Sequence, residues 1–216
     1  MTSRVDRLGH RLRAVRDGRV VVDTLDAVVV TAPGELPQYA VPPADVDGSF
    51  LRGTAGTVPT DAVDAAHAAD RVAIPWAAAD RWYAEDDEVV GHARDPHHRV
   101  DALRSSRLVE VRLGGELVAR SGGHTVVLLE TDRPNRWFLP RVDVNADLRR
   151  SGTVSASPYL GVATHWTAPI DGDRVDVAVS YRAPLPAVAL LENLISFDPD
   201  VAEVAPITNG GGDGRG

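Results

Sequence analysis

Residues 137–144 read Trp-Phe-Leu-Pro-Arg-Val-Asp-Val, and residues 39–46 read Tyr-Ala-Val-Pro-Pro-Ala-Asp-Val. An aromatic residue, a proline and an Asp-Val pair recur at matched positions, at an offset of 137 − 39 = 98 residues. Residues 18–22 likewise match residues 115–119. Because self-similarity at a fixed offset is typical of duplicated units, the sequence predicts two tandem copies of one small domain.

Each copy is predicted to be mainly β, with a few short helices. Short runs rich in Val and Leu are separated by turn signals such as Gly114-Gly115. Residues 107–113 alternate with a period of two, which puts Val109, Val111 and Leu113 on one face of a strand.

The same patterns predict the boundaries of the segments. Val5, Leu8, Leu12 and Val15 are at helical spacing beneath several arginines, and Thr60 is a suitable N-cap. Short helices are expected over residues 61–69, 77–88 and 186–194. The expected segments are a basic helical arm at 1–17, a first repeat at 18–90, a linker at 91–104, a second repeat at 105–202 and a disordered glycine-rich tail at 203–216.

The composition excludes several chemistries. The chain has 216 residues and a formal charge of −8, its 23 basic residues are all arginine, and it has no cysteine. Schiff bases, a phosphate-loop lysine, thiol nucleophiles, disulfides and thiolate-held metals are therefore excluded. We expect no cofactor. The net acidity also argues against a nucleic-acid partner.

No stretch of the sequence is typical of a secretion signal or a membrane span. Residues 1–20 carry six arginines without an unbroken apolar run, and the nearly apolar stretch 183–197 is interrupted by Glu192 and Asn193. We expect a cytoplasmic protein without a membrane partner.

A set of motifs carries a family resemblance. The motifs are Asp80-Arg81-Trp82-Tyr83, residues 91–101 (Gly-His-Ala-Arg-Asp-Pro-His-His-Arg-Val-Asp), residues 137–144, Ser157-Pro158-Tyr159-Leu160-Gly161, and Ser180-Tyr181. Together they resemble the prokaryotic family called domain of unknown function 427 (DUF 427), and the whole chain resembles its two-copy actinobacterial members. The resemblance implies small β-rich domains with tent- or barrel-like sheets and no settled activity.

The chain departs from the family pattern at polar positions. Members usually carry Cys-Pro-Tyr-Lys-Gly, whereas this chain has Ser157 in place of the cysteine and Leu160 in place of the lysine. Asn145 replaces a usual arginine, and His97 replaces a usual aromatic residue. The chain is therefore identified as a divergent member.

The densest polar string is the segment between the repeats, with His92, Asp95, His97, His98 and Asp101. Adjacent side chains of an extended segment point to opposite faces, so we expect no metal site there. Two interpretations stay open. Either these side chains bond to the backbone, or His98 and Asp101 contribute to a ligand or proton-transfer site at the junction.

The aromatic residues predict either core anchors or the walls of a pocket. His165 and Trp166 follow Tyr159 closely, within the stretch that replaces the family's polar motif. The catalytic candidates are His165, Tyr159, His98 and Asp101. The ligand-binding candidates are Trp137, Trp166, Tyr181 and Trp82.

Two pairs of carboxylates offer a possible magnesium site for nucleotidyl transfer. They are Asp45 with Asp47 and Asp171 with Asp173. That chemistry also needs a cradle for a triphosphate, which is not evident here, so turn capping is the favoured interpretation.

We therefore predict a tandem β-domain protein that holds a small organic molecule in an aromatic pocket, with cofactor-independent acid–base chemistry. The alternative is a non-catalytic module for self-association, such as a homodimer, or for partner binding through open sheet edges.

Overall fold

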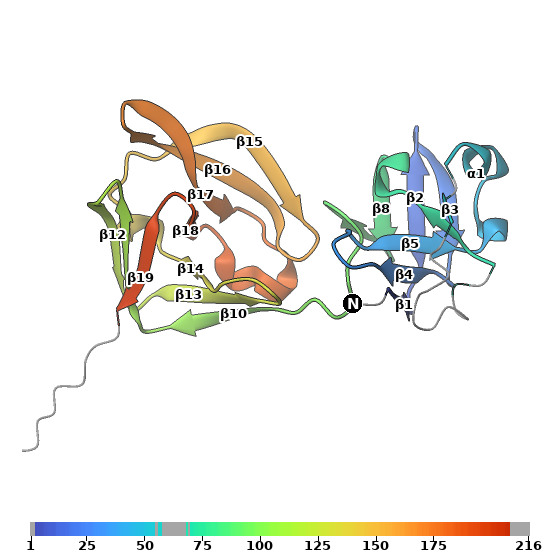
Figure 1. Cartoon of the computed structure of the whole chain (residues 1–216), viewed down its shortest axis with the longest axis horizontal. Helices are drawn as coiled ribbons and strands as arrows, with labels where there is room; N and C mark the ends of the chain where they lie inside the picture. The colour runs from blue at the N-terminus through green and yellow to red at the C-terminus, as the bar shows by residue number, and fades with distance from the viewer. Residues whose placement is uncertain (1–2, 55, 58–67, 69, 208–216) are drawn as a thin grey trace, which may run out of the picture. The chain divides into compact units, whose positions relative to one another are not determined.

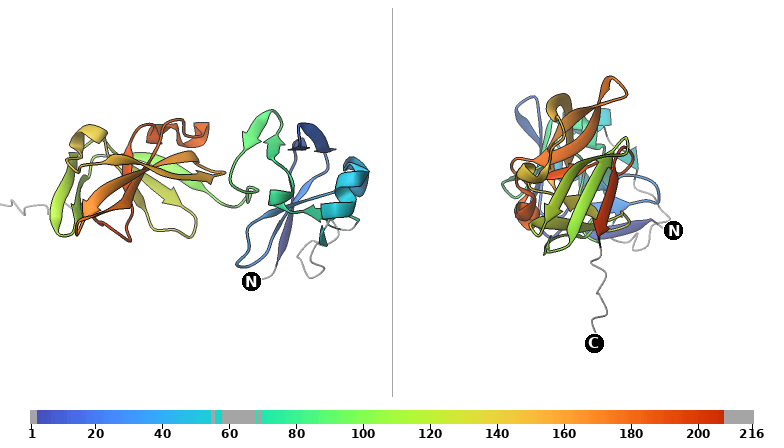
Figure 2. Two further views of the ribbon diagram at one scale, coloured as in Figure 1. Left: turned by 90° about the horizontal axis from the view of Figure 1, so that it is seen from above. Right: turned by 90° about the vertical axis from the view of Figure 1, so that its left-hand side faces the viewer.

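The computed structural model describes residues 3–54, 56, 57, 68 and 70–207, and the chain divides into two compact units, Met1–His98 and Arg99–Gly216. Both units are built mainly from β-strands, which confirms the predicted fold class (Figure 1). Two further views show the same construction (Figure 2). Each unit is described by itself.

The first unit contains two antiparallel sheets, in the orders β1-β4-β5-β7-β6 and β3-β2-β8-β9. Tyr39, Ile74 and Trp82 are buried in the core between them. Its elements are β1 (Arg4–Arg7), β2 (Leu12–Arg16), β3 (Arg19–Thr24), β4 (Val28–Thr31), β5 (Gln38–Val41), the 3-10 helix η1 (Pro43–Asp45), α1 (Gly48–Thr54), β6 (Gly56–Thr57), β7 (Val72–Ile74), the 3-10 helix η3 (Trp76–Ala78), β8 (Arg81–Ala84) and β9 (Asp87–Val89).

The second unit contains three sheets, in the orders β10-β13-β14, β12-β11-β19 and β15-β16-β17-β18. Its elements are β10 (Val100–Ser105), β11 (Leu108–Leu113), β12 (Glu116–Gly122), β13 (Thr125–Glu130), β14 (Arg136–Phe138), the 3-10 helix η4 (Arg141–Asp143), β15 (Arg149–Ser157), β16 (Gly161–Ile170), β17 (Asp173–Tyr181), the 3-10 helix η5 (Pro186–Leu191), β18 (Ile195–Phe197) and β19 (Glu203–Ile207).

Strand alternation divides the interior of the second unit into two cores. On β14, Trp137 packs with Val109 and Val111 of β11, whereas its neighbour Phe138 packs with Leu128 of β13. Successive strand residues point to opposite faces, so one short strand supplies both cores. The alternation predicted for residues 107–113 is confirmed, since Val109, Val111 and Leu113 are buried.

Strands β4 and β5 of the first unit and strands β13 and β14 of the second unit pair in matching registers. Val29 is the partner of Tyr39, and 98 residues later Val127 is the partner of Trp137. In both units the strand then leads into a 3-10 helix, and an isolated bridge follows, Val22 with Val46 and Ala119 with Val144.

Two predicted helices are wrong. The helical arm over 1–17 is replaced by β1 and β2, and the helix over 77–88 by η3, β8 and β9. Leu12 and Ala14 are both fully buried in β2, which pairs with β3 on one side and β8 on the other. Cross-strand pairing thus overrides the helical spacing of the apolar residues.

Other boundaries shift by smaller amounts. The helix expected over 186–194 is the shorter η5, and β10 begins inside the expected linker at 91–104. Residues 203–207 of the expected tail form β19, because they pair with β11. The helix expected over 61–69 and the rest of the tail, 208–216, lie outside the described residues, except for Ala68.

Gly161 is a glycine whose replacement the fold tolerates poorly. Its φ of +103° is unfavourable for other residues, and an added Cβ would lie 3.3 Å from the carbonyl oxygen of Ala183. The backbone there is fixed, because Leu185 N donates a hydrogen bond to Leu160 O over 3.1 Å.

We predict that Gly161→Ala lowers the free energy of unfolding by about 1–3 kcal/mol, measured by urea denaturation. Gly172→Ala is the matched control, because its φ is +94° but nothing lies within 4 Å of an added Cβ. It should cost less. Equal losses for the two variants would contradict the role given to the Ala183 contact.

Candidate functional site

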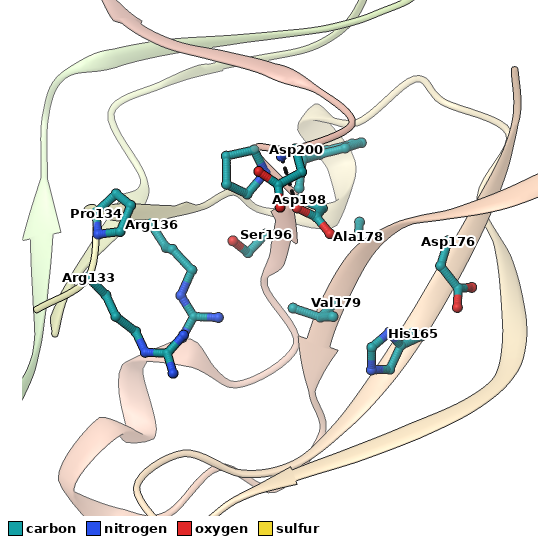
Figure 3. Close-up of a pocket in the computed structure, with 12 residues that line it drawn as sticks. Arg133, Pro134, Arg136, His165, Asp176, Ala178, Val179, Ser196, Asp198 and Asp200 are labelled. Carbon is teal, nitrogen blue, oxygen red and sulfur yellow. Dashed lines mark hydrogen bonds between the residues drawn. The ribbon is translucent and has the colours of Figure 1, made fainter. Parts of the chain in front are cut away.

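A cavity of about 360 Å³ lies over the β15-β16-β17-β18 sheet (Figure 3). Its floor includes a cross-strand row, in which His165 of β16 is the partner of Val179 on β17, and Val179 is the partner of Ser196 on β18. Partners in such a row project from the same face of the sheet. The full lining is Arg133, Pro134, Arg136, His165, Asp176, Ala178, Val179, Ser196, Phe197, Asp198, Pro199 and Asp200.

A register shift in β17 brings an acidic side chain to this face. Trp166 is the partner of Ala178, but Thr167 is the partner of Asp176, so Val177 is an extra residue. Val177 and Ala178 both pack in the core with Trp137. A bulge of this kind re-aims the side chains that follow it, and Asp176 therefore joins His165 on the cavity face.

Two arginines line the cavity, Arg133 from the turn after β13 and Arg136 from the start of β14. Arg133 Nε lies 3.5 Å from Glu130 Oε1, and Arg136 Nη2 donates to Glu130 Oε2 over 3.1 Å. The Glu130 side chain is 7% exposed. A buried carboxylate thus orients two guanidinium groups whose far sides line the cavity.

The Ser196 hydroxyl has no hydrogen-bond partner in the described part of the chain, although the residue is only 2% exposed. Because Ser196 lines the cavity, a water molecule or a ligand there can bond to this hydroxyl. Figure 3 shows this hydroxyl directed toward Arg136.

His165 has a neighbouring hydroxyl and a neighbouring carboxylate. A hydrogen bond of 2.7 Å joins its Nε2 to Ser155 Oγ. Asp176 accepts a hydrogen bond of 2.7 Å from Thr153 Oγ1. Bonds from Thr153 and Ser151, together with the charge of nearby His165, lower the pKa of Asp176, which keeps this carboxylate ionised at neutral pH.

The predicted site residues are only partly brought together. His165 lines the cavity. Trp166 is directed to the opposite face, where its Nε1 donates to Ser180 Oγ over 2.9 Å. Tyr159 packs against the core that contains Phe138. The expected cluster of Tyr159, His165 and Trp166 does not form, because adjacent residues of β16 point to opposite faces.

The other aromatic candidates are structural or adjacent to the cavity. Tyr181 is buried beside Phe138. Trp137 lines a neighbouring hollow of about 460 Å³, with the Arg107 guanidinium 5.0 Å from its ring centroid. Trp82 belongs to the first unit, where it stacks on Trp76 with ring centroids 5.6 Å apart and donates from Nε1 to Trp76 O.

The polar string between the repeats is divided between the units. His97 Nε2 lies 2.9 Å from Asp6 Oδ1, and Asp95 accepts from Arg4, all within the first unit. His98 ends that unit, whereas Asp101 lies in β10 of the second unit, where its Oδ2 is 2.6 Å from Arg99 Nε.

The first pair of carboxylates serves local structure. Asp47 Oδ1 accepts hydrogen bonds from the backbone N–H groups of Ser49 and Phe50 at the start of α1, and Asp45 Oδ2 accepts from Thr24 Oγ1 over 2.6 Å.

Across the described residues, no group of three or more His, Asp or Glu side chains is placed to hold a metal ion. Within the same residues, no helix is long and apolar enough to cross a membrane.

Sequence reasoning missed the two arginines, Ser196 and the aspartates at 198 and 200. The available signal was the charged turn Glu130-Thr131-Asp132-Arg133-Pro134-Asn135-Arg136, which separates two apolar strands. Ser196 carries no such signal, because its neighbours are all apolar and its role depends on the pairing of β18 with β17.

Residues 101–207 match the sequence model of the family described as Domain of unknown function (DUF427), and this part of the chain belongs to that family, as the resemblance implied. The matched range contains every residue that lines the cavity. No curated protein matches the chain.

Tyr181 provides a test of the packing behind the cavity. Burial raises the pKa of its phenol, partly offset by the Arg136 charge and hydrogen bond. A tyrosine whose pKa is raised on folding contributes to the free energy of unfolding, and the contribution is fully present below its unfolded-state pKa of about 10. This contribution is lost as the pH rises through the higher folded-state pKa. The chain has no lysine or cysteine, so the four tyrosines are the side chains that titrate in this range.

We predict that Tyr181→Phe reduces the loss of stability between about pH 9 and pH 11, measured by urea denaturation at several pH values. If the variant loses stability as steeply as the natural chain, the phenol of Tyr181 is not the group responsible.

Proposed function

We propose that the DUF427 domain at residues 101–207 binds a small organic anion, of the carboxylate class, in the cavity over β16, β17 and β18, and that His165 exchanges a proton with it. One observation carries the proposal. Two guanidinium groups, a hydroxyl without a protein partner and an imidazole line a single cavity. Guanidinium and hydroxyl groups are the donors that bind carboxylates.

The charges at the arginine end favour an anion. Arg133 and Arg136 supply two positive charges and Glu130 supplies one negative charge, so the group has a net charge of 2 − 1 = +1. Arg136 is half-buried, and charge–charge attraction is stronger there than in bulk water. Glu130 orients the arginines without neutralising both of them.

The walls suit an apolar body attached to the anionic group. Pro134, Val179 and Phe197 line the cavity beside the polar side chains. Ligand sites typically combine apolar walls with a few convergent polar groups, in volumes of about 300–1,000 Å³. The cavity is at the small end of that range and fits a ligand the size of a single ring.

His165 is the residue suited to proton exchange. Histidine titrates near physiological pH, and an imidazole at a ligand site acts as a general acid or base. Its hydrogen bond to Ser155 holds the ring at the cavity wall.

We also infer that the first unit is a second copy of the same scaffold, without this site. The matched registers of Val29 with Tyr39 and of Val127 with Trp137 support the inference. Between η1 and β7, the part of the first unit that the structure describes contains α1 and β6 but no counterpart of the β15-β16-β17 sheet.

We predict that benzoate binds to the natural chain and that benzamide, which has the same ring without the charge, binds at least about tenfold more weakly. Isothermal titration calorimetry checks this. Arg133→Gln and Arg136→Gln should each weaken benzoate binding by about tenfold or more. Arg149→Gln is the matched control, because Arg149 is an exposed arginine beside Asp147 that does not line the cavity. Equal binding of benzoate and benzamide would refute the proposal.

The role of His165 is tested by proton linkage. We predict that benzoate binding to the natural chain is accompanied by proton uptake or release, seen as a heat that varies with the ionisation enthalpy of the buffer. His165→Gln should abolish this dependence while the chain stays folded, because glutamine retains a group that can bond to Ser155. An unchanged buffer dependence would remove His165 from proton exchange.

A further inference from the structure

We propose that the ligand is a zwitterion, an amino carboxylate whose ammonium group lies toward the acidic side of the cavity. This inference rests on the proposed function and names its substrate class. The observation behind it is that groups of opposite charge line the same cavity without pairing across it.

The two charged sides are distinct in space. Figure 3 shows the guanidinium groups of Arg133 and Arg136 together at one side of the cavity and Asp176 at the other side, beyond Val179. Asp198 and Asp200, on the loop after β18, are the other acidic residues of the lining, and Figure 3 shows them near Ser196, between the arginines and Asp176. A ligand over the floor of the cavity would contact both sides.

The acidic side chains have no arginine partners in the part of the chain that the structure describes. Among the described residues, no ion pair involves Asp176, Asp198 or Asp200, although Arg133 and Arg136 line the same cavity. Asp198 Oδ1 accepts a hydrogen bond of 3.0 Å from Asp200 N, which fixes the loop. Carboxylates that line a partly enclosed cavity attract a bound cation, because charge–charge attraction is stronger there than in bulk water.

Two polar atoms of the lining make no hydrogen bond within the described residues. They are the hydroxyl of Ser196, a residue that is only 2% exposed, and Asp176 Oδ1, which is buried. Ser196 lies beside the arginines and can donate to a carboxylate, whereas Asp176 can only accept. The two unsatisfied atoms therefore call for an acceptor at one side and a donor at the other, which an amino carboxylate provides.

The test compares three probes that share one ring: benzoate, benzylamine and 4-(aminomethyl)benzoate, which carries both charges. We expect the natural chain to bind 4-(aminomethyl)benzoate at least about tenfold more tightly than benzoate in calorimetric titrations at low salt. Asp198→Asn and Asp176→Asn should each reduce this advantage, which is the ratio of the two affinities, severalfold. Asparagine at 198 keeps an oxygen that can accept from Asp200 N. Asp173→Asn is the control, because Asp173 is an exposed aspartate outside the cavity.

The outcomes separate this inference from the proposed function. If benzoate binds and the added aminomethyl group gives no advantage, the zwitterion inference is overturned and the anion site stands. The inference is also overturned if Asp176→Asn and Asp198→Asn both still bind 4-(aminomethyl)benzoate as much more tightly than benzoate as the natural chain does. If no probe that carries a carboxylate binds, the proposed function and the inference fail together.

Discussion

The two-residue period of β14 is the constraint on which the second unit depends. Trp137 and Phe138 are adjacent, yet each enters a different core, so this strand holds two packed layers together. Arg136 projects to the same side as Phe138, with its guanidinium carbon 5.9 Å from the ring centroid. The alternation that builds the cores therefore also delivers a cation to the cavity.

The predictable part of the fold was the part encoded in local patterns. The alternation of Val109, Val111 and Leu113 is visible in the sequence because one face of β11 is buried along its whole length. The helical arm at residues 1–17 was wrong because Leu12 and Ala14 also fit a period of two, and only the partners β3 and β8 decide between the periods.

Of the residues that line the cavity, the sequence predicted His165 as a site residue, because of its residue type alone. Histidine is rare and chemically distinctive, so it is noticed in any sequence. Ser196 and Asp176 reach the cavity through strand register, and register depends on partners far away in the chain. Arg133 and Arg136 depend on Glu130, which becomes an anchor for cations only when it is buried.

The extra residue Val177 gives the β16–β17 hairpin an unusual sensitivity to chain length. With Val177 in place, successive side chains from Asp173 to Asp176 point alternately to the two faces of the sheet, and Asp176 projects to the cavity face. Removal of a single residue at this point would invert that phase and exchange the inner and outer side chains of the strand end. A one-codon deletion could therefore remove Asp176 from the cavity while every aspartate stays in the sequence. In a comparison of related chains, loop and strand lengths would then diagnose the site better than residue identities.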